Sequence, residues 1–325
     1  MFNRILITGG CGFIGSNLVR TLASEVAAHE ILVLDSEVTG NASSLGGVPH
    51  YFIHGDIRDQ SVLEDAIKGV DAVIHLAADT RVIDSIEDPT YNFDVNVKGT
   101  LNLLEAMRKQ GVRSLVNAST GGAIIGDGPQ PVHESMPAYP ASAYGASKAA
   151  AEAYCAAYSQ SYGMDITSLR FSNVYGPRSI HKGSAIAMFV RSILMGEPCQ
   201  VYGDGSQTRD FVFVEDLCQG ILQSLKSKHN GVFQLGSGKP TSINEIIGIL
   251  KIVSGQNDAL RIAYHGFRAG EILHNFADIR KARRDLGFMP QTDLITGIQR
   301  TWDYFQNKLS ALPTSDERGV PQHAD

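Results

Sequence analysis

Short apolar runs alternate with longer amphipathic stretches through the first 175 residues, and this alternation limits the possible folds more than any other feature. The apolar runs are nearly continuous and rich in β-branched residues, as in strands that are buried on both faces. Strands alternating with helices favour an α/β fold with a doubly wound parallel sheet. The expected strands are 4–8, 30–35, 51–56, 72–78, 113–119 and 165–170, and the expected helices are about 14–27, 60–68, 92–110 and 143–162.

The pattern changes after residue 175, where prolines and glycines separate shorter elements. We therefore predict a first domain over 1–175, to which some later helices and strands return, and mainly a smaller α+β lobe over 176–311. Residues 312–325 are polar, contain two prolines and lack periodicity, so we expect a disordered tail.

Charge, cysteine usage and hydropathy exclude several classes of function. The formal net charge of -6 gives no electrostatic reason to bind nucleic acid or an anionic membrane. The four cysteines form no CxxC pair, so neither a metal site nor a disulfide framework is indicated, and isolated thiols fit a reducing cytosol. No apolar stretch reaches the roughly 18 residues of a membrane span, and the first apolar run is too short for a signal peptide. We expect a soluble, cytoplasmic protein without metal.

The segment "ILITGGCGFIGSNLV" places Gly9, Gly12 and Gly15 between the first expected strand and a helix that opens at Phe13. The spacing alone is a weak signal, but this position is typical of a Rossmann dinucleotide site. There, backbone N–H groups and the helix N-terminus approach a pyrophosphate.

Two carboxylates follow at the ends of the next expected strands. Asp35 can accept hydrogen bonds from the adenine-ribose hydroxyls and would repel a 2′-phosphate, so it favours NAD over NADP. Asp56 is a weaker candidate for contact with the adenine, and a solvated loop carboxylate is an equal alternative.

The segment "YGASK" places Tyr144 and Lys148 four residues apart, hence on one face of an expected helix. A tyrosine pKa of about 10 is too high for a base at neutral pH. A neighbouring ammonium, together with a positive nicotinamide ring, would lower this pKa. Upstream, "NASTGGAIIGDG" carries the hydroxyl pair Ser119 and Thr120. By itself this segment fits either a glycine turn or a hydroxyl held beside a reactive group.

Eight ordered segments resemble one known family. They are "TGGCGFIGSNLV", "HLAA", "NVKGT", "NASTGGAIIGD", "YGASK", "RFSNVYGPR", "GDGSQTRDFVFVEDL" and "RAGEI" with its downstream "AD", "KA" and "LG". The chain resembles the extended short-chain dehydrogenase/reductases that act on nucleotide sugars, and within them the UDP-glucose 4-epimerase-like enzymes, to about residue 305. The resemblance implies NAD as cofactor and 4-epimerisation of UDP-Glc and UDP-Gal through a transient 4-keto sugar.

The resemblance also assigns roles to residues. Tyr144 would take the proton of the sugar 4-hydroxyl, Thr120 (with Ser119 second) would share that oxygen, and Lys148 would hold the nicotinamide ribose. Ile125 departs from the family, in which a tyrosine usually stands. The implied cofactor contacts are Gly9, Gly12, Phe13, Ile14, Gly15, Asp35, Asp56, Ile57, Leu76, Ala77, Ala78, Asn96, Tyr144 and Lys148.

Gly121 and Gly122 distinguish between the reactions of the family. Related sugar 4,6-dehydratases carry Asp and Glu directly after their Thr, and glycine cannot transfer a proton. Epimerisation is therefore the leading hypothesis. A dehydratase or a uronate 4-epimerase is the alternative among enzymes, and a non-catalytic NAD(H)-binding scaffold is the alternative of another class.

The resemblance implies substrate contacts in the second lobe. Arg209 and Arg268 would bind the diphosphate, and their guanidinium groups suit bidentate phosphate contact. Asn275, seven residues after Arg268, corresponds to a size gate beside the sugar C2 substituent, so we expect UDP-GlcNAc and UDP-GalNAc to be accepted too. His181 and Lys182 are interpreted as solvated. The full expected substrate set is Thr120, Asn173, Val201, Tyr202, Arg209, Arg268, Glu271 and Asn275.

Relatives usually form homodimers through a four-helix bundle. By resemblance, 92–110 and 143–162 are the helices expected to form it here.

Overall fold

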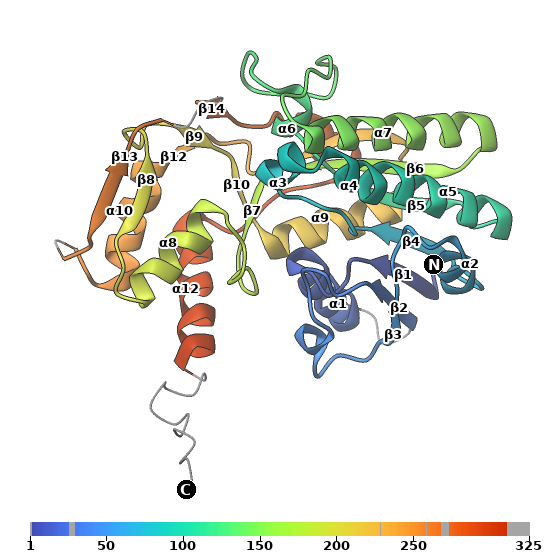
Figure 1. Cartoon of the computed structure of the whole chain (residues 1–325), viewed down its shortest axis with the longest axis horizontal. Coiled ribbons are helices and arrows are strands. Elements are labelled where there is room, and N and C mark those ends of the chain that lie inside the picture. Colours follow the sequence, from blue (N-terminus) through green and yellow to red (C-terminus); the bar gives the residue numbers. More distant parts are fainter. Residues whose placement is uncertain (1, 26–29, 228, 258, 268–272, 311–325) are drawn as a thin grey trace, which may run out of the picture.

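A seven-stranded parallel sheet forms the centre of the molecule in the computed structural model, which describes residues 2–25, 30–227, 229–257, 259–267 and 273–310 (Figure 1). The strand order is β11-β6-β5-β4-β1-β2-β3. The predicted doubly wound α/β fold is therefore confirmed. The strands are β1 (Arg4–Thr8), β2 (Glu30–Asp35), β3 (Tyr51–His54), β4 (Ala72–His75), β5 (Ser114–Thr120), β6 (Asp165–Phe171) and β11 (Gly231–Leu235).

Each face of this sheet is covered by helices. In β1, Ile5 and Ile7 belong to the core cluster on one face, and Leu6 belongs to the cluster on the other, which explains why the strand is continuously apolar. The first face is covered by α1 (Phe13–Glu25), α9 (Val214–Ser227) and α11 (Arg280–Leu286), and the second by α2 (Gln60–Ala66), α5 (Gly99–Gln110) and α7 (Ala143–Tyr162).

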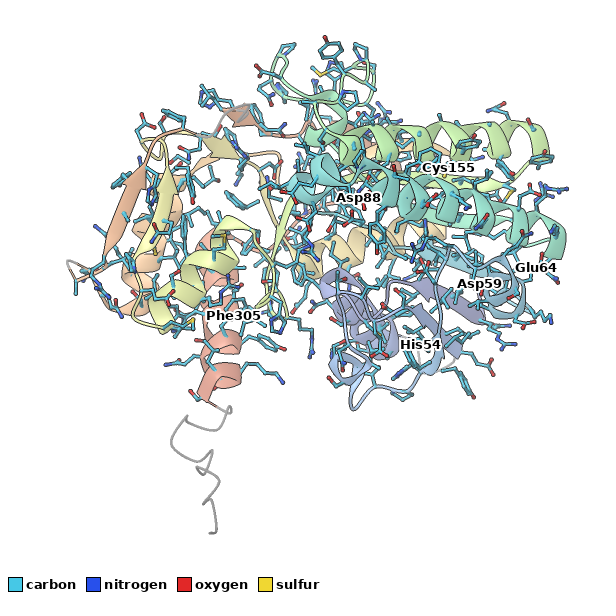
Figure 2. All side chains as sticks on the ribbon, in the orientation of Figure 1. His54, Asp59, Glu64, Asp88, Cys155 and Phe305 are labelled. Atoms are coloured by element: carbon cyan, nitrogen blue, oxygen red, sulfur yellow. The ribbon has the colours of Figure 1, made fainter. Side chains whose placement is uncertain are left out.

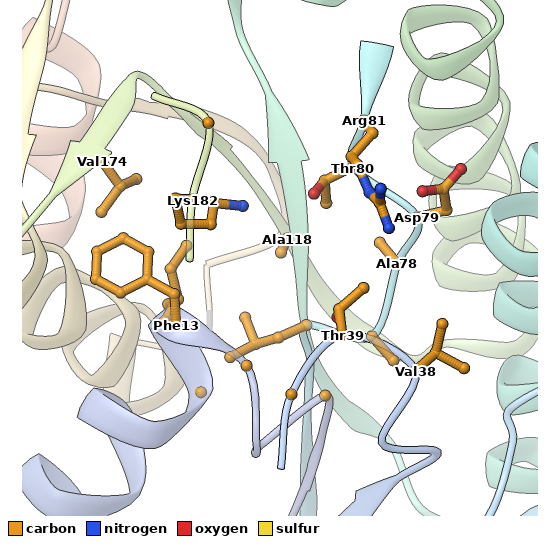
Figure 3. A pocket seen from close by; sticks show the side chains of 18 of the residues that line it. Phe13, Val38, Thr39, Ala78, Asp79, Thr80, Arg81, Ala118, Val174 and Lys182 are labelled. Atoms are coloured by element: carbon orange, nitrogen blue, oxygen red, sulfur yellow. The ribbon is translucent and has the colours of Figure 1, made fainter. Parts of the chain in front are cut away.

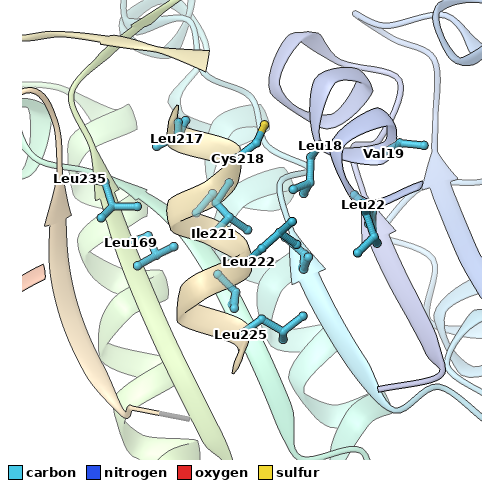
Figure 4. Packing of buried hydrophobic residues seen from close by; sticks show 14 of the residues in the cluster. Leu18, Val19, Leu22, Leu169, Leu217, Cys218, Ile221, Leu222, Leu225 and Leu235 are labelled. Atoms are coloured by element: carbon cyan, nitrogen blue, oxygen red, sulfur yellow. The ribbon is translucent and has the colours of Figure 1, made fainter. Parts of the chain in front are cut away.

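Segments far apart in the sequence meet on the first face. Leu217 and Ile221 of α9 lie between Leu18 of α1 and the strand residues Leu169 and Leu235 (Figure 4). Helix α9 and strand β11 thus return to the sheet from beyond residue 175, as the sequence predicts.

The second lobe has its own apolar core, which includes Phe189, Ile246, Trp302 and Phe305 (Figure 2). Its elements are α8 (Ala185–Leu194), α10 (Ile243–Ser254), α12 (Leu294–Ser310), and the parallel pair β8 (Cys199–Tyr202) and β13 (Ile262–His265). Two small sheets join the lobes: β7 (Asn173–Tyr175) with β10 (Phe211–Phe213), and β12 (Thr241–Ser242), β9 (Thr208–Arg209) and β14 (His274–Asn275).

The expected helix over 92–110 is confirmed as helical throughout, and the helix begins earlier, at Pro89. It divides into α4 (Pro89–Phe93), a π-helical turn over Asp94–Lys98, and α5. The sequence analysis also missed α3 (Val82–Glu87), α6 (Gly122–Ile125) and the 3₁₀ turn Ala42–Leu45. The predicted tail lies outside the described residues. Every helix in the described ranges is too short or too polar to cross a bilayer.

Replacing Ile221 by Ala should destabilise the fold, because its side chain is fully buried between α1 and the sheet. We expect a loss of about 2–5 kcal/mol in the free energy of unfolding, measured by urea denaturation. Ile252→Ala in α10 is the matched control, because 67% of its surface is exposed, and should change stability by no more than about 0.5 kcal/mol. Equal losses in the two variants would contradict this packing.

Candidate active site

A cleft of about 1920 Å³ opens at the carboxyl ends of β1, β2, β4 and β5 and extends to the second lobe. Strand order reverses between β1 and β4, and ligands of doubly wound sheets bind at such a reversal. In Figure 3, Phe13 opens α1 at one side of the cleft and Asp79–Arg81 form the opposite wall, while Lys182 reaches in from the loop after β7.

The turn between β1 and α1 requires glycine at two positions. Gly9 has a φ of 71°, and a Cβ on it would lie 2.6 Å from the backbone nitrogen of Ala77. A Cβ on Gly15 would lie 2.3 Å from the carbonyl oxygen of Gly9. The turn therefore packs directly on the end of β4, and the amides of the first turn of α1 face the cleft. This arrangement fits a dinucleotide pyrophosphate.

The Asp35 carboxylate fixes the turn from the end of β2. Its Oδ2 accepts a hydrogen bond from the Cys11 amide at 2.8 Å, and its Oδ1 accepts one from the Glu37 amide at 2.8 Å. Asp35 also lines the cleft, and each carboxylate oxygen has a further lone pair for a ribose hydroxyl. The residues present therefore fit a dinucleotide without a 2′-phosphate.

Asp56 lines the cleft while it is paired with Arg58 at 2.7 Å. Burial alone would raise the pKa of Asp56, but the hydrogen bonds from Arg58 lower it below its ordinary value. The expected cofactor residues Ile57, Leu76, Ala77 and Ala78 also line the cleft.

Asn96 requires a correction, because it is 1% exposed and is not part of the described cleft lining. Its Oδ1 accepts a hydrogen bond from the Asp79 amide at 2.9 Å, and its Nδ2 donates to the Asp79 carbonyl at 2.8 Å and to Ser147 Oγ at 3.0 Å. It therefore holds the wall of the cleft from behind.

Tyr144 and Thr120 both line the cleft, and Thr120 lies close enough to Tyr144 to lower its pKa through hydrogen bonding. Tyr144 lies in the first turn of α7, and its amide donates to Ser85 Oγ at 3.1 Å. Lys148, one turn further, is 4% exposed, and its Nζ donates to the Ala118 carbonyl at 3.1 Å.

Burial governs the pKa values of Tyr144 and Lys148. Burial raises the pKa of Tyr144 to about 12; the hydrogen bond with Thr120 lowers it and the charge of Asp79 raises it. Burial also lowers the pKa of Lys148 to about 8. In the protein without a nicotinamide ring, burial dominates both groups, so the expected lowering of the Tyr144 pKa by Lys148 together with that ring stays a prediction for the NAD-bound protein.

Ser119, the second candidate hydroxyl, is engaged elsewhere. It is 4% exposed, and its Oγ donates to Glu152 Oε1 at 2.5 Å. Thr120 is therefore the hydroxyl of the pair that meets Tyr144.

Two amide side chains occupy the space beside the glycines after Thr120. A Cβ on Gly121 would lie 2.5 Å from Gln234 Oε1, and a Cβ on Gly122 would lie 2.7 Å from Asn275 Nδ2. Gln234 is fully buried. Acidic side chains at 121 and 122 would displace these amides.

Four of the expected substrate residues, Thr120, Asn173, Arg209 and Asn275, line the cleft, and Asn275 is the strand partner of Arg209. Asn275 Nδ2 is buried and has no hydrogen-bond partner within the described part of the chain. Arg268 and Glu271 lie outside the described residues.

The sequence analysis expected Val201 and Tyr202 to contact substrate. Neither residue is part of the described cleft lining. Val201 is 1% exposed in the core of the second lobe, and the ring of Tyr202 stacks on His265 at 5.2 Å.

The sequence analysis missed several cationic side chains of the lining. Arg178 has a φ of 71°, donates to the Ser44 carbonyl at 3.2 Å and stacks on Tyr304 of α12 at 5.5 Å. Lys182 is exposed but points into the cleft, so its interpretation as merely solvated is incomplete (Figure 3). Burial and the charge of Arg81 lower the Lys182 pKa. Their position directly after "NVYG" was the available signal.

Comparisons with known proteins agree with this geometry. The model of the NAD-dependent epimerase/dehydratase family matches residues 5–236. A putative UDP-glucose 4-epimerase from Methanocaldococcus jannaschii is 41% identical over 93% of this chain and 98% of its own length. A dTDP-glucose 4,6-dehydratase from Streptomyces griseus is 33% identical over 95% of this chain and 96% of its own.

Solved structures are similar over nearly the whole chain. The UDP-glucose 4-epimerase of Thermus thermophilus in complex with NAD is 37% identical with a TM-score of 0.86, over 93% of this chain and 99% of its own. The UDP-N-acetylglucosamine 4-epimerase of Methanobrevibacter ruminantium is 31% identical with a TM-score of 0.89, over 94% of this chain and 99% of its own.

Asp35→Ala should reduce the NAD content of the purified protein about tenfold or more, because one carboxylate both orders the turn and faces the ribose. The content is measured by releasing nucleotide from denatured protein. Asp59→Asn, which alters only the cap of α2 outside the described cleft lining, should retain NAD. Unchanged NAD content in Asp35→Ala would refute the assignment.

Proposed function

This chain belongs to the NAD-dependent epimerase/dehydratase family, and we propose that it is an isomerase that interconverts UDP-sugars differing in configuration at C4. One observation carries this proposal. Tyr144, Thr120 and Lys148 all line the cleft, Thr120 lies close enough to Tyr144 to lower its pKa through hydrogen bonding, and the two positions that follow Thr120 are glycines without an acid or a base.

In the proposed reaction, Tyr144 as phenolate accepts the proton of the sugar 4-hydroxyl, and Thr120 hydrogen-bonds the same oxygen. NAD⁺, which the glycine turn and Asp35 would hold, would supply a reversible acceptor for the C4 hydride and a positively charged ring. Lys148 adds a second positive charge that favours the phenolate. Once the 4-keto sugar presents its other face, Tyr144 returns its proton to the oxygen, and C4 is inverted.

We further propose that sugars with an N-acetyl group at C2 are substrates as well. Asn275 Nδ2 is a buried donor without a partner in the described part of the chain. It lies next to Gly122, and Asn275 pairs with Arg209 of the neighbouring strand. An acetamido carbonyl could accept its hydrogen bond, and a buried donor without an acceptor is costly. The similarity to a UDP-N-acetylglucosamine 4-epimerase supports this choice.

The rival reactions fit the site less well. A 4,6-dehydratase needs proton-transferring groups where Gly121 and Gly122 stand, and Gln234 and Asn275 occupy that space. By resemblance, enzymes acting on UDP-glucuronate tend to carry Thr at the position of Asn173. A scaffold that only binds NAD(H) does not require the Thr120 and Tyr144 pair.

The proposal is tested by incubating the purified protein with UDP-Glc, UDP-Gal, UDP-GlcNAc, UDP-GalNAc and dTDP-Glc. A new anomeric NMR signal with unchanged mass supports the epimerase. A product lighter by one water identifies a dehydratase, and the absence of any product favours the scaffold.

Tyr144→Phe should lower kcat by about 10³-fold, within the range of general acid–base catalysis, while NAD remains bound. Thr120→Ala should have a smaller effect, because Tyr144 retains its proton-accepting oxygen. Tyr139→Phe is the matched control, because this tyrosine is 81% exposed. Full turnover by Tyr144→Phe would exclude the mechanism.

Asn275→Tyr should lower kcat/KM for UDP-GalNAc about tenfold or more and spare UDP-Gal, because the larger ring fills the space beside Gly122. Asn275→Ala keeps this space but removes the Nδ2 donor, so it should turn over both substrates with a lowered kcat/KM for UDP-GalNAc and an unchanged one for UDP-Gal. The size gate is refuted if Asn275→Tyr still turns over both sugars equally.

We also propose a homodimer formed by α5 and α7, as expected from the resemblance. Tyr154 and Tyr162 of α7 are 41% and 51% exposed, which supports a partner on this face. Sedimentation of the purified protein tests the assembly: a single-chain mass would contradict it.

A further inference from the structure

Glu152 and Arg170 form a buried ion pair beside β5, the strand that ends at Thr120. The proposed reaction gives this pair no role. Glu152 of α7 accepts hydrogen bonds from Arg170 Nε at 2.9 Å, from Arg170 Nη2 at 2.8 Å and from Ser119 Oγ at 2.5 Å. The side chains of Arg170 and Glu152 are only 7% and 8% exposed. Because removing two charges from water is costly, such a pair is weak evidence for stability alone.

The pair joins the three elements around the catalytic residues. Ser119 precedes Thr120 on β5, and Arg170 is its strand partner on β6. Glu152 lies on α7, four residues after Lys148, so both occupy one helix face.

Few charged groups face Lys148 in this buried environment. Burial lowers the pKa of Lys148, whereas Cys155 and Glu152 raise it. Cys155 remains an uncharged thiol, because burial raises its pKa to about 12. His75 of β4 remains neutral as well, because burial and the Lys148 charge lower its pKa to about 3.

The Arg170 guanidinium on β6, which is paired with Glu152, is not among the groups that shift the Lys148 pKa, and Glu152 is the remaining anion. Tyr144 is a neutral phenol in the protein alone, and Asp79 acts on Tyr144 from the loop after β4. Ala118 contributes only its carbonyl oxygen.

We propose that Glu152 is a positioning residue whose carboxylate, fixed by Ser119 and Arg170, keeps the Lys148 ammonium charged. In an environment of low dielectric constant, one fixed negative charge has a large effect on a neighbouring ammonium. The consequence for turnover rests on the proposed function, in which the charged Lys148 supports the Tyr144 phenolate.

The first test is the pH profile of kcat for Glu152→Gln. Without the carboxylate, Lys148 loses its proton at lower pH. The alkaline limb of the kcat profile should therefore shift to lower pH by on the order of one pH unit. Glu152→Asp, which restores a charge, should return the limb toward the wild-type position. Ser119→Ala removes a hydrogen bond but no charge, so its limb should stay in place. A limb unchanged in Glu152→Gln would overturn the proposal.

A second test requires neither turnover nor cofactor. Glu152→Gln leaves Arg170 without a counter-charge, so the double variant Glu152→Gln/Arg170→Met provides a neutral pair if the single variant does not fold. In lysine-labelled protein, the Lys148 resonance is identified as the one that is missing from the NMR spectrum of Lys148→Met. The pH midpoint of the Lys148 titration should be lower in the double variant than in the wild type. An unmoved midpoint overturns the inference. A shifted midpoint in a protein that epimerises no sugar supports the inference while refuting the proposed function.

Discussion

The site depends on one backbone contact. The glycine turn after β1 approaches the end of β4 closely. Gly9 packs against the Ala77 backbone at a distance that any side chain would block, and Asp35 holds the turn in place through the Cys11 amide. The start of α1 is thereby set at the point where strand order reverses. The cleft and its cofactor end follow from that placement.

Burial then sets the chemistry at the other end of the cleft. It raises the pKa of Tyr144 and lowers that of Lys148, so each group is driven toward its neutral form in the protein alone. A positively charged ligand beside the phenol favours the phenolate of Tyr144, whereas it disfavours the charged form of Lys148. The reactive form of the proposed enzyme is thus created by cofactor binding, and Glu152 opposes the loss of charge at Lys148.

The sequence predicted the elements whose patterns are local. Strands 4–8 and 30–35 and helix 143–162 have the expected bounds, because their apolar periodicity is uninterrupted. The π-helical turn over Asp94–Lys98 escaped prediction, because apolar periodicity continues through it. Val201 and Tyr202 were misplaced because packing within the second lobe decides their orientation. Arg178 and Lys182 follow the "NVYG" segment, but their entry into the cleft depends on how the loop after β7 folds, which apolar periodicity does not encode.

The fit of Gln234 and Asn275 against Gly121 and Gly122 also bears on how this chain could change over evolutionary time. Introducing an acid and a base after Thr120 would produce steric overlap at two positions more than a hundred residues away in the sequence. Each new Cβ would meet the end of an amide side chain, so an acid or a base at position 121 or 122 would require Gln234 or Asn275 to change its side-chain conformation. A change toward proton transfer at these two positions would therefore involve residues of β11 and β14 as well as the glycines.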